Sequence, residues 1–155
     1  MNSKQWAELP AHSRFWCFCA AEPWTESQDA LVLDHLDRLC HEWKAHGQPI
    51  DAGFTTIDRR LIALAVDERT HAASGCSIDS RMKALTELSQ ALGIDLFGRM
   101  MLYVRPNPSE SWTALSLREA RQANGEFLNT VAQIKGDWQP VLPIEGSWLR
   151  PSTRG

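Results

Sequence analysis

Hydrophobic positions along the first two thirds of the chain show two kinds of spacing, one typical of strands and one of helices, which predict four strands and two helices. Short apolar or alternating runs, bounded by polar residues, glycine or proline, are typical of strands. Four segments have this pattern: Arg14–Ala20, Ile50–Thr56, Leu61–Val66 and Met100–Val104. Apolar residues at helical spacing predict helices over 25–46 and 77–92. The predicted order along the chain is therefore βαββαβ.

Local signals mark where these elements begin and end. Thr25 and Gln28 have the spacing of a capping box, and Gly47 is expected to end the first helix. Gly93 is expected to end the second helix. The segment Asp58–Arg60 allows a tight reversal between the second and third strands. These signals agree with the hydrophobic pattern.

The βαββαβ order predicts the fold class. It is the signature of a ferredoxin-like sandwich, an α+β fold in which one antiparallel four-stranded sheet carries both helices on one face. The continuous apolar run Leu61–Val66 is typical of a central strand. We therefore expect the strands that start near Arg14 and Arg60 to lie in the centre of the sheet and not at an edge.

The length of 155 residues fits one domain, 1–155, with an ordinary hydrophobic core. We assign about 13–106 to the ferredoxin-like core and 107–155 to a C-terminal extension. In the extension a second capping box, Ser116 with Glu119, predicts a third helix. The remainder of the extension is rich in tryptophan and proline and is expected to lie over the body of the domain.

Composition and charge exclude several classes of protein. A net charge of −3 with scattered Lys and Arg does not predict a nucleic-acid-binding groove. No apolar stretch approaches the roughly 20 residues of a membrane-spanning helix, and the segment Met1–Arg14 lacks the apolar run of a signal peptide. The uneven spacing of the four cysteines does not resemble a secreted disulfide framework. We expect a cytoplasmic protein with reduced thiols.

The cysteines and tryptophans are expected to serve mainly in packing. Cys17 and Cys19 are separated by one residue, rather than the two to four that are usual in zinc sites, so neither a metal site nor a cofactor is predicted. We place both of these thiols, and that of Cys40, in the core. The seven tryptophans either pin loops onto the core or form an exposed aromatic surface for a protein partner.

The segment Ala73–Ser80 is the strongest candidate for a functional site. Small residues and a glycine run into the second predicted helix, with a lone cysteine at the junction. The first turn of a helix has unpaired backbone N–H groups, which stabilise an anion or a thiolate. The segment therefore predicts an anion-binding loop, a reactive thiol, or plain capping of the helix. The candidate ligand-binding residues are Ser74, Gly75, Cys76, Ser77, Asp79 and Arg105.

The ferredoxin-like topology would gather further reactive side chains at the same end of the sheet. The set expected there is His12, His46, Asp67, Glu68, His71, Cys76, Ser77, Asp79 and Arg105. A thiol enzyme built from this set would use Cys76 as the nucleophile and His46 or His71 as the base. The backbone N–H of Ser77 would serve as the oxyanion donor.

No nucleotide-binding motif occurs in the chain. A phosphate-binding loop needs two glycines with four residues between them, followed by lysine and then serine or threonine, and no segment matches this pattern. The nucleophile motif G-x-S-x-G is absent as well. ATP hydrolysis is therefore not expected.

Four segments of the chain resemble a known family: His46–Pro49, Leu64–Glu68, Ala73–Ser80 and Gly93–Phe97. The family consists of small uncharacterised bacterial proteins that are often labelled as ABC-transporter ATPases, and the resemblance runs from about residue 16 to 104. The string at Ala73–Ser80 is specific to this family, so the resemblance implies that its glycine, cysteine, second serine and aspartate are hallmark positions. The ATPase label is not carried over, because the phosphate-binding loop is missing.

Three functions follow from these observations. The leading one is a non-catalytic ligand-binding or regulatory module that takes a small anionic ligand at the Gly75–Asp79 loop. The first alternative is a thiol-dependent enzyme with Cys76 as its nucleophile. The second is a scaffold whose exposed aromatic side chains bind a protein partner. The fold alone does not choose among them.

Overall fold

The computed structural model describes residues 6–45, 48–68, 75–97 and 101–152, with the backbone alone at 44–45, 48–49, 75–78 and 80. The elements of the N-terminal part are β1 (Arg14–Cys19), α2 (Glu26–His41), β2 (Lys44–Ala45), β3 (Gln48–Pro49), β4 (Asp51–Ile57), β5 (Leu61–Asp67) and α3 (Gly75–Leu92). Those of the C-terminal part are β6 (Met101–Arg105), β7 (Thr113–Ser116), α4 (Leu117–Gln122), β8 (Glu126–Leu128), the 3-10 turn η1 (Lys135–Asp137) and β9 (Val141–Pro143).

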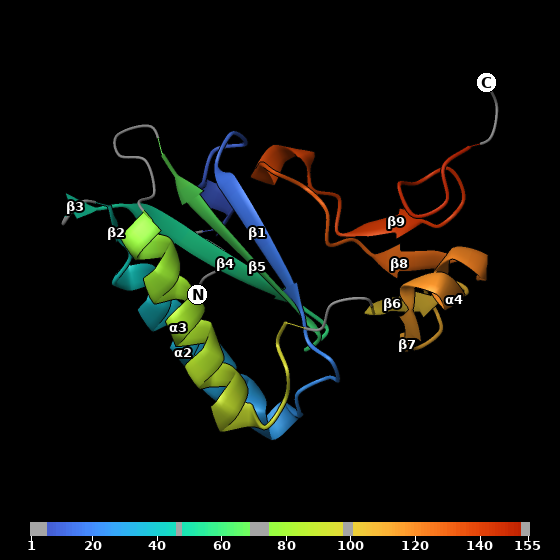
Figure 1. Ribbon diagram of the computed structural model, residues 1–155, viewed down its shortest axis with the longest axis horizontal. Helices are drawn as coiled ribbons and strands as arrows, with labels where there is room; N and C mark the ends of the chain where they lie inside the picture. The colour runs from blue at the N-terminus through green and yellow to red at the C-terminus, as the bar shows by residue number, and fades with distance from the viewer. Residues whose placement is uncertain (1–5, 46–47, 69–74, 98–100, 153–155) are drawn as a thin grey trace.

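Three layers make up the molecule (Figure 1). The helices α2 and α3 lie side by side on one face of a three-stranded sheet, β1-β5-β4. A four-stranded sheet, β7-β6-β8-β9, packs against the other face, where Phe15 and Leu61 of the first sheet meet Tyr103 and Leu128 of the second. Both sheets are antiparallel. The protein is therefore of the α+β class, with both predicted helices on one face.

The strand order of the first sheet differs from the predicted order. β5 is the central strand and β1 and β4 flank it, so β1 lies at an edge among the described strands. β6 does not join this sheet, because it pairs with β7 and β8 instead. The prediction of one four-stranded sheet with both β1 and β5 in its centre is therefore wrong, and the ferredoxin-like order is not formed.

The residues that follow β6 explain why it leaves the first sheet. Leu102 and Val104 on one face of β6 are buried with Phe127 and Ile144 from the C-terminal part. Tyr103 on the opposite face is buried against β1 and β5. β6 thus has hydrogen-bonded neighbours on both edges and apolar cover on both faces, which an edge position in the first sheet would not provide. Residues 107–155 were predicted as an extension over the body, and strands between residues 113 and 143 of this part complete the second sheet.

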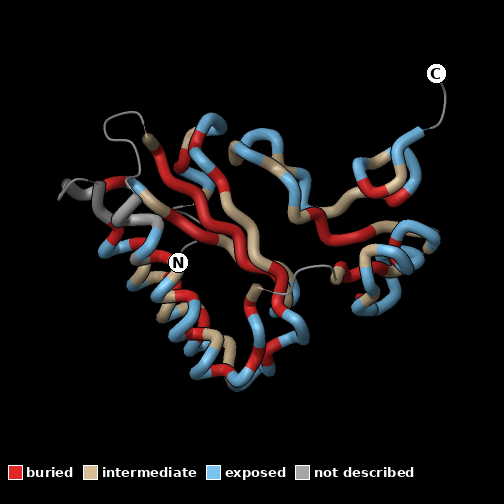
Figure 2. The backbone as a smooth tube through the Cα atoms, viewed as in Figure 1, coloured by how far each residue is buried: buried red, intermediate tan, exposed pale blue. Residues whose placement is uncertain are grey.

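β5 is buried along its whole length (Figure 2). Ile62, Leu64 and Val66 pack in the core beneath the helices, and Leu61 and Ala63 pack in the core between the sheets. Full burial of one large aliphatic side chain contributes about 1.5–3 kcal/mol to folding. The predicted central position of this strand is confirmed.

The predicted turn, both capping boxes and the helix end at Gly93 are confirmed, whereas Gly47 lies outside the described residues. Asp58 and Arg59 have φ values of 50° and 55°, the left-handed region that a two-residue reversal between antiparallel strands requires. Thr25 caps α2 and Ser116 caps α4, each within a complete capping box. Gly93 has φ +68° just after the end of α3.

α2 ends at His41, earlier than the predicted end near 46. The backbone turns at Glu42, and Trp43 is buried with its ring stacked on that of Trp16, at 5.6 Å between centroids. Lys44 begins the short strand β2. The helix therefore ends just before the residues whose indole is buried and whose backbone pairs in a strand.

Most tryptophans pack into the molecule. Trp148 is 37 % exposed, and the other six are buried or half-buried. Trp6 and Trp138, for example, contact each other and Phe15 of β1. This arrangement agrees with tryptophans that pin loops onto the core.

Candidate functional site

The first predicted site lies at the start of α3. Gly75 is the first residue of this helix, so Cys76 and Ser77 belong to its first turn, where backbone N–H groups favour an anion. Asp79 is exposed. Outside the described residues lie His46, His71, Ser74 and the side chains of Cys76 and Ser77.

Some of the expected side chains do meet at this end of the first sheet. His12 Nε2 lies 3.6 Å from Asp67 Oδ1 at the end of β5. Arg14 Nη1 lies 3.5 Å from Glu68 Oε1. His12 is exposed and Asp67 is buried, so the carboxylate orients an imidazole that solvent can reach.

Arg105 does not belong to this group, and its predicted position there is wrong. Its Nε lies 2.6 Å from Glu126 Oε2, and its guanidinium carbon lies 3.9 Å from the centroid of the Trp112 ring. The Trp112 indole donates to Asp58 Oδ2 at 2.7 Å, in the β4–β5 turn. That turn is at the opposite end of β5 from Asp67. The position of Arg105 differs from the predicted one because its strand, β6, belongs to the second sheet.

A cavity of about 470 Å³ lies along the outer edge of β1. Its walls come from β1, α3, β6 and α4, with Phe97, Thr130 and Trp148 between them. In the described part of the chain no second strand pairs with this edge of β1 over Cys17–Cys19. The cavity therefore occupies the place where the predicted sheet would have continued, and its volume is that of a small-molecule site.

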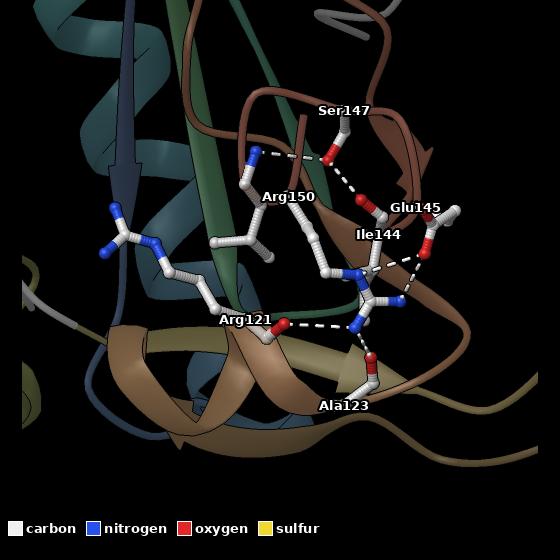
Figure 3. A network of polar contacts seen from close by, with 7 residues as sticks. Arg121, Ala123, Ile144, Glu145, Ser147 and Arg150 are labelled. Atoms are coloured by element: carbon white, nitrogen blue, oxygen red, sulfur yellow. Dashed lines mark hydrogen bonds and ion pairs between the residues drawn. The ribbon is translucent and has the colours of Figure 1, made fainter. Parts of the chain in front are cut away.

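The turn that carries Trp148 is tied firmly to the second sheet. The Trp148 indole donates to Asn129 Oδ1 at 2.8 Å. Arg150 Nη1 donates to the carbonyl oxygens of Arg121 and Ala123 at 3.0 and 2.9 Å, at the end of α4 (Figure 3). A cationic side chain there satisfies carbonyl groups that the helix leaves unpaired. This wall of the cavity is thus preformed.

Arg81, in the second turn of α3, is the cation of this cavity. It is 6 % exposed, and its Nε and Nη1 atoms have no hydrogen-bond partner among the described residues. Its guanidinium carbon lies 4.7 Å from the ring centroid of Trp16 and 5.4 Å from that of Phe18. Burial, and then the charge of Arg14, lower the pKa of Arg81 to about 10, so it stays protonated at pH 7. Unpaired donors on a buried cation favour an anion.

Sulfur atoms line another part of the same cavity. They come from Cys17 and Cys19 of β1, Met82 of α3 and Met101 of β6. Burial raises the pKa of Cys19 to about 12 and, with the neighbouring thiol of Cys19, raises that of Cys17. Burial also raises the pKa of Cys40 to about 12. The predicted core placement is confirmed for Cys19 and Cys40, whereas Cys17 is half-buried and packs against the core between the sheets. At neutral pH the three thiols are protonated and poor nucleophiles.

Sequence reasoning missed Arg81 and the cavity. A charged residue on a helix is exposed in most proteins, so the residue type of Arg81 does not predict its burial. Yet Arg81 lies on the stripe formed by Leu85, Leu88 and Leu92, at spacings of four, seven and eleven residues. An arginine within an apolar stripe is the feature of the sequence that could have predicted this buried cation.

Comparisons of the chain with protein-family models, with curated proteins and with solved structures find no match. Among the described residues, no helix combines the length and the apolar character needed to cross a membrane. In the same residues no group of three or more His, Cys, Asp and Glu side chains is placed to hold a metal ion.

Proposed function

We propose that this protein is a non-catalytic binding or regulatory module whose ligand is a small organic anion, held in the cavity beside β1. The anionic group binds the Arg81 guanidinium, and the apolar body lies against the aromatic and sulfur-containing walls. One observation carries the proposal: a buried, protonated arginine lines a cavity and has two nitrogens without a partner among the described residues.

The energetics of a buried cation support an anionic ligand. A buried donor without a partner costs about 1–3 kcal/mol, and more when it is charged. The rings of Trp16 and Phe18 offset only part of this cost, since a cation–π contact contributes about 0.5–2 kcal/mol. A carboxylate or phosphate supplies the missing acceptors and a compensating charge. The site is therefore incomplete without an anion.

The start of α3 belongs to the same proposal. Arg81 lies six residues after Gly75, which corresponds to about 9 Å along the helix axis. The backbone of the predicted ligand residues Gly75 to Ser77, and Asp79, would lie at the end of a ligand that extends from Arg81 toward the helix N-terminus. The helix dipole there attracts negative charge as well. Cytoplasmic location is part of the proposal, because reduced thiols suit that compartment.

Thermal unfolding with four probes tests the proposal: benzoate, hexanoate, phenyl phosphate and the neutral analogue benzamide. Ligands that bind only the folded state raise the unfolding temperature as their concentration rises. We expect the three organic anions to stabilise the protein and to change its tryptophan fluorescence, because Trp148 lines the cavity, and benzamide to do neither. Arg81→Gln should abolish the effect of the anions.

Arg38→Gln is the matched control, because Arg38 lies exposed on α2 in an ion pair with Asp34. This variant should respond to the anions as the wild type does. Equal stabilisation by benzoate and benzamide, or an undiminished response in Arg81→Gln, would contradict the proposal. Failure of all three anions to stabilise the wild type would contradict it too.

A further inference from the structure

Three sulfur-containing side chains, two from β1 and one from β6, line the cavity. Cys17 and Cys19 are alternate residues of β1, so both thiols point to the same face of the first sheet. Met101 begins β6, and its Sδ lies 3.8 Å from Cys19 Sγ. All three side chains line the cavity. This grouping is formed only because β6 lies in the second sheet, opposite β1.

We propose that these three side chains bind one soft monovalent metal ion of the Cu(I) type. Thiolate and thioether sulfurs are the ligands that select Cu(I), whereas hard cations require oxygen donors. Two metal–sulfur bonds of about 2.3 Å that meet at about 110° place their sulfur atoms about 3.8 Å apart. The distance between Cys19 Sγ and Met101 Sδ has this value.

Neither thiol is committed to a strong interaction that the metal would have to break. Cys17 Sγ lies 3.9 Å from the carbonyl oxygen of Asn129, and Cys19 Sγ lies 3.8 Å from that of Ala20. Both are long contacts of weak donors. The thiols can therefore turn toward an ion in the cavity.

The binding step balances in protons and charge without any redox change. Each thiol that coordinates the ion loses one proton to solvent, and the metal stays monovalent throughout. With both thiols ionised, the complex carries one negative charge, which the Arg81 guanidinium in the same cavity offsets. Because protons are released, apparent affinity should rise with pH.

Competition with a chromophoric Cu(I) chelator, under anaerobic reducing conditions, tests the site. The full chain carries Cys40→Ser and Cys76→Ser, so that the two cavity thiols are the only ones left. We expect one equivalent of Cu(I) to bind, and Zn(II) in equal amount not to displace it. Loss of an outer-shell partner already weakens metal sites about 10- to 100-fold, so Cys19→Ser and Met101→Leu should each weaken binding at least tenfold.

Met101→Leu keeps the volume of the side chain and removes only the donor atom, so it serves if Cys19→Ser fails to fold. Binding that is unchanged in Met101→Leu, or that Zn(II) displaces, would overturn the proposal. The ligands of the metal are the three sulfur atoms and not the anion site, although the Arg81 charge favours the complex. Arg81→Gln should still bind one equivalent of Cu(I), with lower affinity because the compensating charge is gone, while it loses stabilisation by benzoate. The two proposals can therefore fail independently of each other.

Discussion

Arg81 occupies a position at which the helical spacing of the neighbouring leucines predicts an apolar side chain. It continues the apolar stripe of α3, and the structure buries it against Trp16 and Phe18. A buried charge at such a position lowers stability unless a partner neutralises it. Residues that function requires are often destabilising in this way.

The first prediction follows from this cost. Arg81→Met should raise the free energy of unfolding, in the absence of any anion, by about 1–3 kcal/mol, because it removes unpaired donors and keeps the apolar stem. Urea unfolding measures the change. Arg38→Met, at an exposed position of α2, should stay within about 0.5 kcal/mol of the wild type. A less stable Arg81→Met variant would mean that the guanidinium already has a partner in the unliganded protein.

The second prediction concerns the thiols. Only the thiolate reacts, and burial raises the pKa of Cys19 and Cys40 to about 12, so both should alkylate slowly at pH 7.5. Their rates should rise about tenfold per pH unit while the protein stays folded. Cys76, at the start of α3, is expected to react faster at neutral pH. Mass spectrometry of each cysteine across a pH series measures these rates, and a Cys76 that reacts only after denaturation would exclude the thiol-enzyme alternative.

At the scale of elements, boundaries set by short-range chemistry were predicted well. The capping boxes at Thr25 and Ser116 and the reversal at Asp58–Arg60 depend on residues within four positions of one another. The end of α2 was predicted too late, because the chain leaves the helix before Trp43, whose ring stacks on that of Trp16. Trp16 is 27 positions away in the chain, beyond the reach of local signals.

The third prediction tests the cap of α2. Thr25→Ala removes the hydroxyl that accepts from the Gln28 backbone N–H, and it should lower the free energy of unfolding by about 1 kcal/mol. Thr86→Ala is the matched control, because this exposed threonine lies within α3 and donates only to the carbonyl of Met82. Alanine favours a helix interior, so the control should be neutral or slightly stabilising. Urea unfolding measures both variants. If the two lose the same free energy of unfolding, the capping box contributes nothing specific.

At the scale of the whole molecule, the two cores depend on one strand between them. β5 contributes alternate residues to the core under the helices and to the core between the sheets. Each core shields a thiol from water: Cys40 is buried under the helices, and Cys19 is buried between the sheets. Ionisation of either one therefore opposes folding.

The fourth prediction is a loss of stability at alkaline pH. In the unfolded chain the Cys40 thiol ionises near pH 9, whereas burial and then the charge of Asp37 keep it protonated up to about 12 in the folded protein. Below pH 9 both states hold the proton; between these values only the unfolded state releases it, so stability falls as pH rises. Each such thiol contributes about 1.4 kcal/mol per pH unit.

Urea unfolding between pH 10 and 11.5 measures this slope. Cys40→Ala should reduce it by about 1.4 kcal/mol per pH unit. Val32→Ala, at a neighbouring buried position of α2, should lower stability equally at every pH and leave the slope unchanged. A slope that is the same in Cys40→Ala and in the wild type would show that this thiol titrates alike in both states.

The sequence by itself determined the elements and much of their burial. Alternation, helical spacing and capping residues act over a few positions, so the six predicted strands and helices of the first two thirds, the cap of α4 and the start of α3 near Cys76 follow from local chemistry. It also determined that Leu61–Val66 is a central strand, because only a strand covered on both faces is apolar throughout.

Only the tertiary structure decided which sheet β6 joins. An edge of β1 and an edge of β7 offer β6 the same backbone hydrogen bonds. The choice depends on the side chains of later residues, such as Phe127 and Ile144, that cover its faces. Because β6 joined the second sheet, Arg105 lies near the end of β5 opposite Asp67, and Met101 lies beside the thiol of Cys19. The position of β6 also leaves open the cavity beside β1 in which Arg81 is buried. Local sequence patterns do not predict this arrangement, because the place of a strand in a sheet depends on competition among partners that are distant in the chain.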